Sequence, residues 1–334
     1  MAENILSVQD LHTSFHTDNG EVMAVNGVNF NLAAGKILGI VGESGSGKSV
    51  TAYSIMQILE KNGAIKSGKI LYKGEDITKW PEQKMRDFRG KCCSIIFQDP
   101  MTSLNPVFTV GFQLEEAIRL HTERRGKEAE RRAIEMLELV GVNEPEKRIR
   151  QYPYELSGGM RQRVMIAMAL ACEPDILIAD EPTTALDVTI QAQILELMQS
   201  LQKKLGMAII MVTHDLGVIA QMADEIIVMY GGRVCERGTA EDIFYHPCHE
   251  YTKGLLRSIP NVDRIGQKLE PISGTPINLL NMPKGCAFCP RCDAAMKICL
   301  EEQPPEVRTM DGHLVSCWAH IREEIDAGLI TVQG

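Results

Sequence analysis

Residues 36–49 read KILGIVGESGSGKS, and this stretch decides the fold. Its first part, KILGIV, is a short unbroken apolar run of the kind that forms a buried parallel strand. GESGSGKS (42–49) then fits the phosphate-loop pattern G-x-x-x-x-G-K-[ST] in full, and a helix is expected from Lys48 to about Leu59. Glycines let successive backbone N–H groups turn inward at a helix start, where the helix dipole favours an anion. We therefore expect Lys48 to reach phosphates and Ser49 to hold Mg²⁺.

Other apolar runs extend this pattern along the chain. DILIAD (175–180) and MAIIMVT (207–213) each predict a buried strand, and residues 188–205 between them have helical spacing. Strand, helix and strand in this order indicate an α/β fold with a parallel sheet covered by helices. We also expect strands at about 4–11 and 22–33, a helical insertion at about 100–170 and a hairpin at 225–238.

The composition describes an ordinary globular chain. Of its 334 residues 44% are hydrophobic and 24% charged, and the net charge is −9. This acidic balance argues against a protein that binds nucleic acid by broad phosphate neutralisation. The start, MAENILSVQDLHTSF, lacks the features of a signal peptide, and no apolar stretch reaches the ~18 residues of a spanning helix. We expect a cytoplasmic chain that reaches a membrane only through a partner.

A phosphate loop of this kind needs a carboxylate for the metal and a group that orients the attacking water. Asp180 ends a predicted buried strand, where a carboxylate is costly unless it meets a cation or the water bound to it. Glu181 follows directly and is expected to act as general base toward the water. Such a pair is only moderately specific by itself, and the complete phosphate loop strengthens it.

A second stretch, LSGGMRQR (156–163), is also suited to face a phosphate. If Ser157 caps a helix that runs through MRQRVMIAMAL, its hydroxyl, the Gly158 and Gly159 amides and the helix dipole form a second anion site. One chain cannot easily present both sites to one nucleotide, which points to an arrangement of two chains.

Together the motifs resemble the ATP-binding subunits of ABC transporters, over about residues 5–240. The matching stretches are GESGSGKS (42–49), Gln98 in IIFQDP, LSGGMRQR (156–163), ILIADEP (176–182), ALD (185–187) and His214 in VTHD. The resemblance implies a P-loop, RecA-like core with an N-terminal antiparallel β subdomain, a helical subdomain and a small cysteine-rich extension. It also implies a head-to-tail dimer in which each ATP lies between the phosphate loop of one subunit and the LSGG stretch of the other.

The same resemblance assigns roles to individual residues. It implies catalytic roles for Glu181, His214, Gln98 and Lys48, and Mg²⁺ ligation by Ser49, Gln98 and Asp180. The implied ATP contacts are Phe15, Gly42, Glu43, Ser44, Gly45, Ser46, Gly47, Lys48, Ser49, Val50, Gln98, Asp180, Glu181 and His214, and those to the partner's ATP are Ser157, Gly158, Gly159 and Asp187. Phe15 would stack on the adenine, with a place in the core as the alternative. Gln98 and His214 also have a structural alternative, as an ordinary loop Gln and strand-end His.

Three further stretches resemble the subunits of oligopeptide and dipeptide importers: 95–111, 179–195 and 246–256. They imply a peripheral subunit on the cytoplasmic face of the inner membrane. Its implied partners are a homologous second ATPase, two transmembrane permease subunits and an extracytoplasmic substrate-binding protein, with no nucleic acid. The segment after Gln98 would dock on the permeases, or be an ordinary loop. Nickel-chelate and glycoside importers stay open as alternatives, as does a soluble ABC ATPase that acts on ribosomes or DNA.

Half of the ten cysteines lie between residues 286 and 317. Clustered thiols in a cytosolic chain typically hold zinc or an iron–sulfur cluster. The importer resemblance implies a [4Fe–4S] cluster on Cys286, Cys292, Cys299 and Cys317, with Cys289 as a substitute ligand or a bystander. Zinc and no metal remain alternatives.

The remaining cysteines are scattered, and we expect them to be buried small hydrophobic residues: Cys92, Cys93, Cys172, Cys235 and Cys248. The composition shifts to Pro, Asn and Cys beyond about residue 255. We therefore predict an ATPase domain at 1–255 and a C-terminal extension at 256–334.

Overall fold

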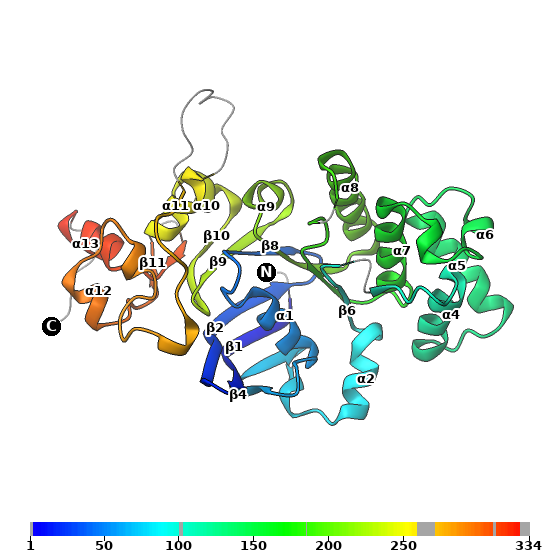
Figure 1. Cartoon of the computed structure of the whole chain (residues 1–334), viewed down its shortest axis with the longest axis horizontal. Coiled ribbons are helices and arrows are strands. Elements are labelled where there is room, and N and C mark those ends of the chain that lie inside the picture. Colours follow the sequence, from blue (N-terminus) through cyan, green and yellow to red (C-terminus); the bar gives the residue numbers. More distant parts are fainter. Residues whose placement is uncertain (1–2, 100–102, 185, 259–270, 310–311, 328–334) are drawn as a thin grey trace. The chain divides into compact units, whose positions relative to one another are not determined.

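The computed structural model describes residues 3–99, 103–184, 186–258, 271–309 and 312–327 (Figure 1). The chain forms two compact units that alternate along the sequence. The first comprises residues 1–6, 32–37 and 72–212, and the second comprises residues 7–31, 38–71 and 213–334. The LSGG stretch lies in the first unit, and the phosphate loop lies in the second.

A parallel sheet forms the centre of the first unit. Its strands are β6 (Cys93–Ile96), β7 (Ile176–Asp180) and β8 (Ala208–Thr213), with Ile178 beside Ile210. Every residue of β7 and β8 is buried, which accounts for their unbroken apolar sequences. Both predicted strands and their parallel pairing are confirmed, whereas β6 had no clear signal in the sequence.

The helix α8 (Val188–Leu205) connects β7 to β8, over the residues predicted for it. Its buried side chains include Ile194, Leu195, Met198 and Leu201, which follow one face at helical spacing. Asp187 accepts a hydrogen bond from the Ile190 N–H at its start, and Gly206 in a left-handed conformation ends it.

Four helices make up the predicted helical insertion: α4 (Val110–His121), α5 (Lys127–Leu139), α6 (Pro145–Arg148) and α7 (Gly158–Leu170). Contacts of α5 with α4 and with α7 hold them together, and Figure 1 shows them in green. The prediction is confirmed for the described residues. This unit also contains β5 (Glu75–Asp76), η1 (Ile77–Lys79), α2 (Glu82–Lys91) and η2 (Pro153–Glu155).

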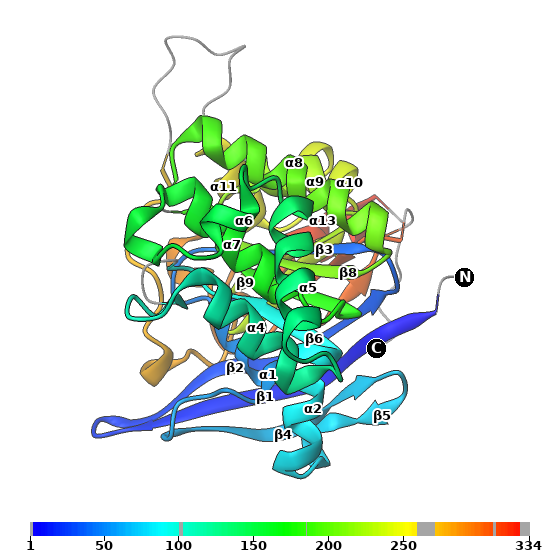
Figure 2. The ribbon, with the colours of Figure 1, turned by 90° about the vertical axis from the view of Figure 1, so that its right-hand side faces the viewer.

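The second unit contains most of β1 (Asn4–Thr17), β2 (Gly20–Ala33) and β4 (Gly63–Tyr72), in the order β2-β1-β4 (Figure 2). Only two residues join β1 to β2, the connection of an antiparallel hairpin. The strands predicted at 4–11 and 22–33 are therefore confirmed, and both are longer than predicted.

The phosphate loop follows β3 (Ile37–Val41), which pairs in parallel with β9 (Glu225–Tyr230). As predicted, β9 forms an antiparallel hairpin with β10 (Arg233–Gly238). The helix α1 (Lys48–Met56) ends earlier than predicted because Gln57 adopts a left-handed conformation, with φ of 50°.

The C-terminal extension adds two strands to this hairpin. The strand β12 (Leu314–Val315) pairs with β10, and β11 (Val307–Arg308) pairs with β12. The other elements of this unit are α9 (Leu216–Met222), α10 (Ala240–Tyr245), α11 (Glu250–Arg257), η4 (Leu279–Asn281), η5 (Cys289–Arg291), α12 (Lys297–Glu301) and α13 (Trp318–Asp326). The predicted domain boundary at residue 255 stays a prediction. No helix of the described residues has the length and apolar character needed to cross a bilayer.

Candidate nucleotide site and cysteine-rich segment

The phosphate loop has the backbone shape that its glycines predict. Gly42 has φ of 151° and Gly47 has φ of 98°. A Cβ atom would lie 2.2 Å from the Met229 oxygen at Gly42, and 2.4 Å from the Ala24 oxygen at Gly47. Both positions therefore require glycine for conformation and for space. The helix α1 starts directly after Gly47 without a side-chain cap, an arrangement that suits an anion at its N-terminus.

Lys48 is buried beside this loop, with 5% of its surface exposed. Its Nζ donates to the carbonyl oxygens of Gly42 (2.7 Å) and Glu43 (2.9 Å). The ammonium group thus connects the start of the loop to the first turn of α1. This position agrees with the predicted role toward phosphates, which remains a prediction.

Two residues of the C-terminal half contact Glu43, and sequence reasoning missed both. The backbone N–H of Glu43 donates to Tyr251 Oη at 2.8 Å. Its carboxylate accepts two hydrogen bonds from the Arg291 guanidinium, at 2.5 and 3.0 Å. Burial raises the pKa of Tyr251, so its hydroxyl stays neutral. The carboxylate of Glu43 raises the pKa of Arg291, which keeps that side chain charged.

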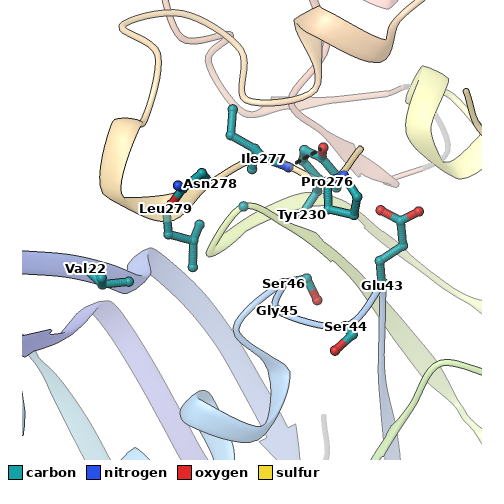
Figure 3. A pocket seen from close by; sticks show the side chains of 11 residues that line it. Val22, Glu43, Ser44, Gly45, Ser46, Tyr230, Pro276, Ile277, Asn278 and Leu279 are labelled. Carbon is teal, nitrogen blue, oxygen red and sulfur yellow. Dashed lines mark hydrogen bonds between the residues drawn. The ribbon is translucent and has the colours of Figure 1, made fainter. Parts of the chain in front are cut away.

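A cavity of about 280 Å³ opens beside Glu43, Ser44, Gly45 and Ser46 (Figure 3). Its other walls are Val22 of β2, the β9–β10 turn at Tyr230 and Gly231, and residues 276–279 of the extension. The Ile277 N–H donates to Tyr230 Oη at 3.3 Å, which ties the extension to this turn. The first half of the phosphate loop therefore faces C-terminal residues of the same unit.

Two other predicted ATP contacts, Phe15 and His214, lie in the same unit. Phe15 is half-buried in β1, and a Cβ atom at Gly63 would lie 2.6 Å from its ring. His214 is exposed and follows β8 directly. Neither lines the cavity, so their proposed contacts with adenine and γ-phosphate stay predictions.

The first unit brings together three predicted residues at the end of β7. Asp180 is the last residue of the strand and is 1% exposed. Glu181 has φ of 48°, a strained conformation for a residue with a side chain. Its carboxylate accepts hydrogen bonds from Gln98 Nε2 (2.9 Å) and Thr184 Oγ1 (2.8 Å). The turn thus fixes the direction of the carboxylate that follows the buried Asp180.

The LSGG stretch forms a helix start, as predicted. Ser157 Oγ accepts a hydrogen bond from the Met160 N–H at 3.4 Å, at the N-terminus of α7. A Cβ atom at Gly159 would lie 2.9 Å from Ile190 of α8, so the starts of α7 and α8 are close. Asp187 is exposed and caps α8. Ala185, of the predicted ALD motif, lies outside the described residues.

Gln162 is a further residue that sequence reasoning missed. It is fully buried in α7, and its Nε2 donates to the Pro182 carbonyl oxygen at 2.6 Å. This bond connects the LSGG helix directly to the loop that follows Glu181. In the sequence, only its position after LSGGM could have indicated a role for Gln162.

Comparison with known proteins assigns the family. The ABC transporter family model matches residues 25–184, and the model of the oligopeptide/dipeptide transporter C-terminal region matches residues 235–299. The dipeptide transport ATP-binding protein DppD of Bacillus subtilis is 54% identical over 317 residues, 95% of each chain. The oligopeptide transport ATP-binding protein OppD of Escherichia coli is 51% identical over 322 residues, 96% of this chain and 95% of that one. The chain belongs to the ATP-binding subunits of oligopeptide and dipeptide ABC transporters.

Solved structures of ABC ATPases share this fold. A dimeric ATP-binding cassette in a post-hydrolysis state, bound to ADP and phosphate, matches with a TM-score of 0.63 and 27% identity, over 70% of this chain and 98% of that one. An ABC transporter component from Clostridium perfringens matches with a TM-score of 0.63 and 30% identity, over 73% of this chain and 92% of that one. The predicted P-loop ABC ATPase fold is confirmed.

Several thiols of the C-terminal region influence one another electrostatically. The pKa of Cys286 is raised to about 11, by burial and then by the nearby Cys317 and Cys299 thiols. The pKa of Cys292 is raised to about 12, by burial and by Cys317 and Cys286. Cys289 is influenced by Cys299 alone among these thiols. Cys286 is thus near two of the other predicted ligands, and Cys292 is near Cys286 and Cys317.

The spacing of these thiols bears on the kind of metal. Zinc binds thiolate sulfur at about 2.3 Å, so two sulfurs on one zinc ion lie at most about 4.6 Å apart. Among the described residues, the cysteines of this region do not form a group of three within 4.8 Å of one another. The thiols as they lie here do not form a site for one zinc ion on three of these cysteines, and the predicted [4Fe–4S] cluster stays a prediction.

Glu236, Cys248 and His313 form a tighter group. His313 Nε2 lies 2.8 Å from the Glu236 carboxylate, and its Nδ1 lies 3.8 Å from Cys248 Sγ. Glu236 also accepts hydrogen bonds from the N–H groups of Cys248 and His249. The two ring nitrogens of His313 thus face different partners. Through Glu236, which lies in β10, this polar contact joins the C-terminal extension to that strand. Of the scattered cysteines, Cys93 and Cys235 are buried as predicted, and Cys92, Cys172 and Cys248 are only half-buried.

Proposed function

We propose that this ABC ATPase drives a peptide importer, by coupling ATP binding and hydrolysis in a head-to-tail dimer to transport through membrane subunits. The high identity to dipeptide and oligopeptide transport ATP-binding proteins over nearly the whole chain supports the cargo. The observation that carries the chemistry is the Glu181 carboxylate, fixed by Gln98 and Thr184 directly after the buried Asp180.

In this proposal each subunit binds ATP through its phosphate loop. Ser49, Gln98 and Asp180 would hold Mg²⁺, because hydroxyl, amide and carboxylate oxygens are the ligands that this ion prefers. Mg²⁺ neutralises charge on the phosphates when it is bound. Lys48 stabilises the negative charge that develops on the β- and γ-phosphates. The buried ammonium group beside the loop supports this role.

Glu181 acts on the water. Its oxygen accepts a proton as the water attacks the γ-phosphate, and its bonds to Gln98 and Thr184 keep the carboxylate in one orientation. His214 contacts the γ-phosphate and maintains this geometry. Phe15 stacks on the adenine.

The partner subunit completes the site. Ser157, Gly158 and Gly159 of the facing chain contact the γ-phosphate through a hydroxyl, backbone N–H groups and the positive end of α7, and Asp187 lies at the seam. ATP therefore holds the two subunits together, and loss of the γ-phosphate lets them separate. The second ATPase is a homologous subunit in this proposal.

The complex contains two permease subunits and an extracytoplasmic binding protein, and this chain is peripheral on the cytoplasmic face of the inner membrane. Cys286, Cys292, Cys299 and Cys317 would hold a [4Fe–4S] cluster, and the bound cluster would stabilise the C-terminal extension. This ligand set is the one that the resemblance to peptide importers implies.

The test is to purify the complex through a tag on this chain, identify its subunits and reconstitute it in liposomes. We expect two permeases and a second ATPase, with ATP hydrolysis stimulated by the binding protein loaded with peptide. Stimulation by a nickel chelate or an oligosaccharide instead would contradict the assignment of peptide as the cargo. Co-purification with ribosomes would contradict a role in transport. A brown preparation whose visible absorption is bleached by dithionite supports the cluster, and a colourless zinc protein contradicts it.

A further inference from the structure

The phosphate loop is attached to the cysteine-rich extension at one residue, Glu43. Its backbone N–H donates to Tyr251, and its carboxylate binds both terminal nitrogens of Arg291. Arg291 is separated from Glu43 by 248 residues and lies in η5, next to Cys292. The backbone N–H and the carboxylate of Glu43 are therefore both bound by side chains from outside the loop.

The environment of Arg291 makes this pairing specific. Its side chain is 4% exposed, so the guanidinium depends on partners within the protein. Its other N–H groups donate to the carbonyl oxygens of Ser273 (2.9 Å) and Ile272 (3.3 Å) and to Tyr230 Oη (3.4 Å). A planar guanidinium can satisfy the two carboxylate oxygens and these acceptors at once, whereas the point charge of a lysine cannot.

An aromatic layer supports the same contact. Phe288, between Cys286 and Cys289, packs edge-on against Tyr230 with 5.3 Å between the ring centres. It also lies 5.3 Å from Tyr251, and the Tyr230 and Tyr251 rings are 4.7 Å apart. These rings are buried, so the position of η5 is defined by packing as well as by hydrogen bonds.

The contact continues from Glu43 to the residue that faces the phosphates. The carbonyl oxygen of Glu43 accepts a hydrogen bond from Lys48 Nζ at 2.9 Å and one from the Ser46 N–H at 3.2 Å. A shift of Glu43 would therefore move an acceptor of Lys48 and change the turn at Ser46. The chain of contacts runs from Arg291 through Glu43 to Lys48.

We propose that Arg291 is a positioning residue for ATP: by holding Glu43 it fixes the first half of the phosphate loop, so that ATP affinity depends on the cysteine-rich extension. This rests on the proposed binding of ATP to the phosphate loop. A guanidinium that only stabilised the extension would leave the affinity of the folded protein unchanged. The two roles therefore predict different results for nucleotide binding.

The experiment titrates the full-length chain with a fluorescent ATP analogue in the presence of Mg²⁺. The variants are Arg291→Gln, Arg291→Lys, Glu43→Gln and the double variant Arg291→Gln/Glu43→Gln. Arg322→Gln is the matched control, because Arg322 is exposed in the same extension and pairs with Asp326 in α13. Thermal unfolding establishes that each variant is folded.

We expect Arg291→Gln and Glu43→Gln each to weaken binding about tenfold, within the range usual for coupled sites. The double variant should be no weaker than either single one, because both changes break the same link. Arg291→Lys should be intermediate, and Arg322→Gln should bind like the wild type. In the assembled transporter, Arg291→Gln should raise KM for ATP with little change in kcat.

Unchanged affinity in folded Arg291→Gln, or additive losses in the double variant, would overturn the proposal. Should Arg291→Gln not fold, Glu43→Gln tests the same link from the loop side, and normal binding by that variant overturns it. Failure of the wild type to bind the analogue would instead contradict the proposed nucleotide site itself.

Discussion

The side-chain amide of Gln98 donates a 2.9 Å hydrogen bond to the carboxylate of Glu181, across 83 residues of sequence. Gln98 follows β6 and Glu181 follows β7, and these two strands are parallel neighbours. Parallel strands end at the same edge of a sheet, which brings the two side chains together. Thr184 binds the same oxygen, so the carboxylate is oriented before any water is bound.

Replacing Glu181 by Gln should abolish hydrolysis and leave ATP binding intact. The amide cannot take a proton from water, but it has nearly the same shape as the carboxylate. We expect turnover to fall by at least about 100-fold, and ATP to hold the variant as a dimer that size-exclusion chromatography detects. Glu138→Gln, an exposed change in α5, is the control. Normal turnover in Glu181→Gln would refute the assignment of the base.

Ser157 and Thr109 offer a matched test of the LSGG helix start. Each is an N-cap, and its hydroxyl accepts a hydrogen bond from the N–H three residues on. Replacement by Ala should destabilise either helix by about 1 kcal/mol, measured by denaturant unfolding. Only Ser157→Ala should also lower ATP turnover, by at least about tenfold, because it alone is proposed to face the partner's γ-phosphate. Equal turnover in the two variants would show that Ser157 acts only as a helix cap.

Variants of Cys289 and Cys292 test which of the two cysteines is a ligand of the proposed cluster. Burial raises the pKa of both thiols, and Cys317 and Cys286 raise that of Cys292 further, whereas Cys299 raises that of Cys289. We expect Cys292→Ser to lose visible absorption and iron, and Cys289→Ser to keep both after anaerobic purification. Iron and acid-labile sulfide are measured per chain. If the cluster is kept in Cys292→Ser and lost in Cys289→Ser, then Cys289 is the ligand and Cys292 is the bystander.

His249 should make stability depend on pH. It is buried, and its Nδ1 accepts the Tyr251 N–H at the start of α11. Burial lowers its pKa from 6.5 to about 4. Between these values the unfolded chain binds a proton that the folded chain does not. The stabilising contribution is thus complete above pH 6.5 and is lost as the pH falls toward 4.

The slope from this one group is at most about 1.4 kcal/mol per pH unit. His249→Asn keeps a cap but does not titrate, so its urea unfolding free energy should fall less steeply between pH 6.5 and 4. Equal slopes for the variant and the wild type would show that His249 does not cause the effect.

The sequence predicted well those features that depend on neighbouring residues. The unbroken apolar runs of β3, β7 and β8 identify buried strands, because both faces of such strands must exclude water. The helix α8 was predicted over its full length from its apolar periodicity. By contrast, α1 ended early at Gln57, since a left-handed residue selected by its surroundings leaves no such signal.

The sequence by itself therefore determined the phosphate loop, the strands β3, β7 and β8, the helix α8 and the cap at Ser157, since each depends on residues within one turn, one strand or one helix. The tertiary structure alone decided that Gln98 meets Glu181, that Arg291 binds Glu43 and that Gln162 donates to the Pro182 carbonyl oxygen. Such contacts join residues far apart in the chain, and only the path of the folded backbone brings their side chains within hydrogen-bonding distance.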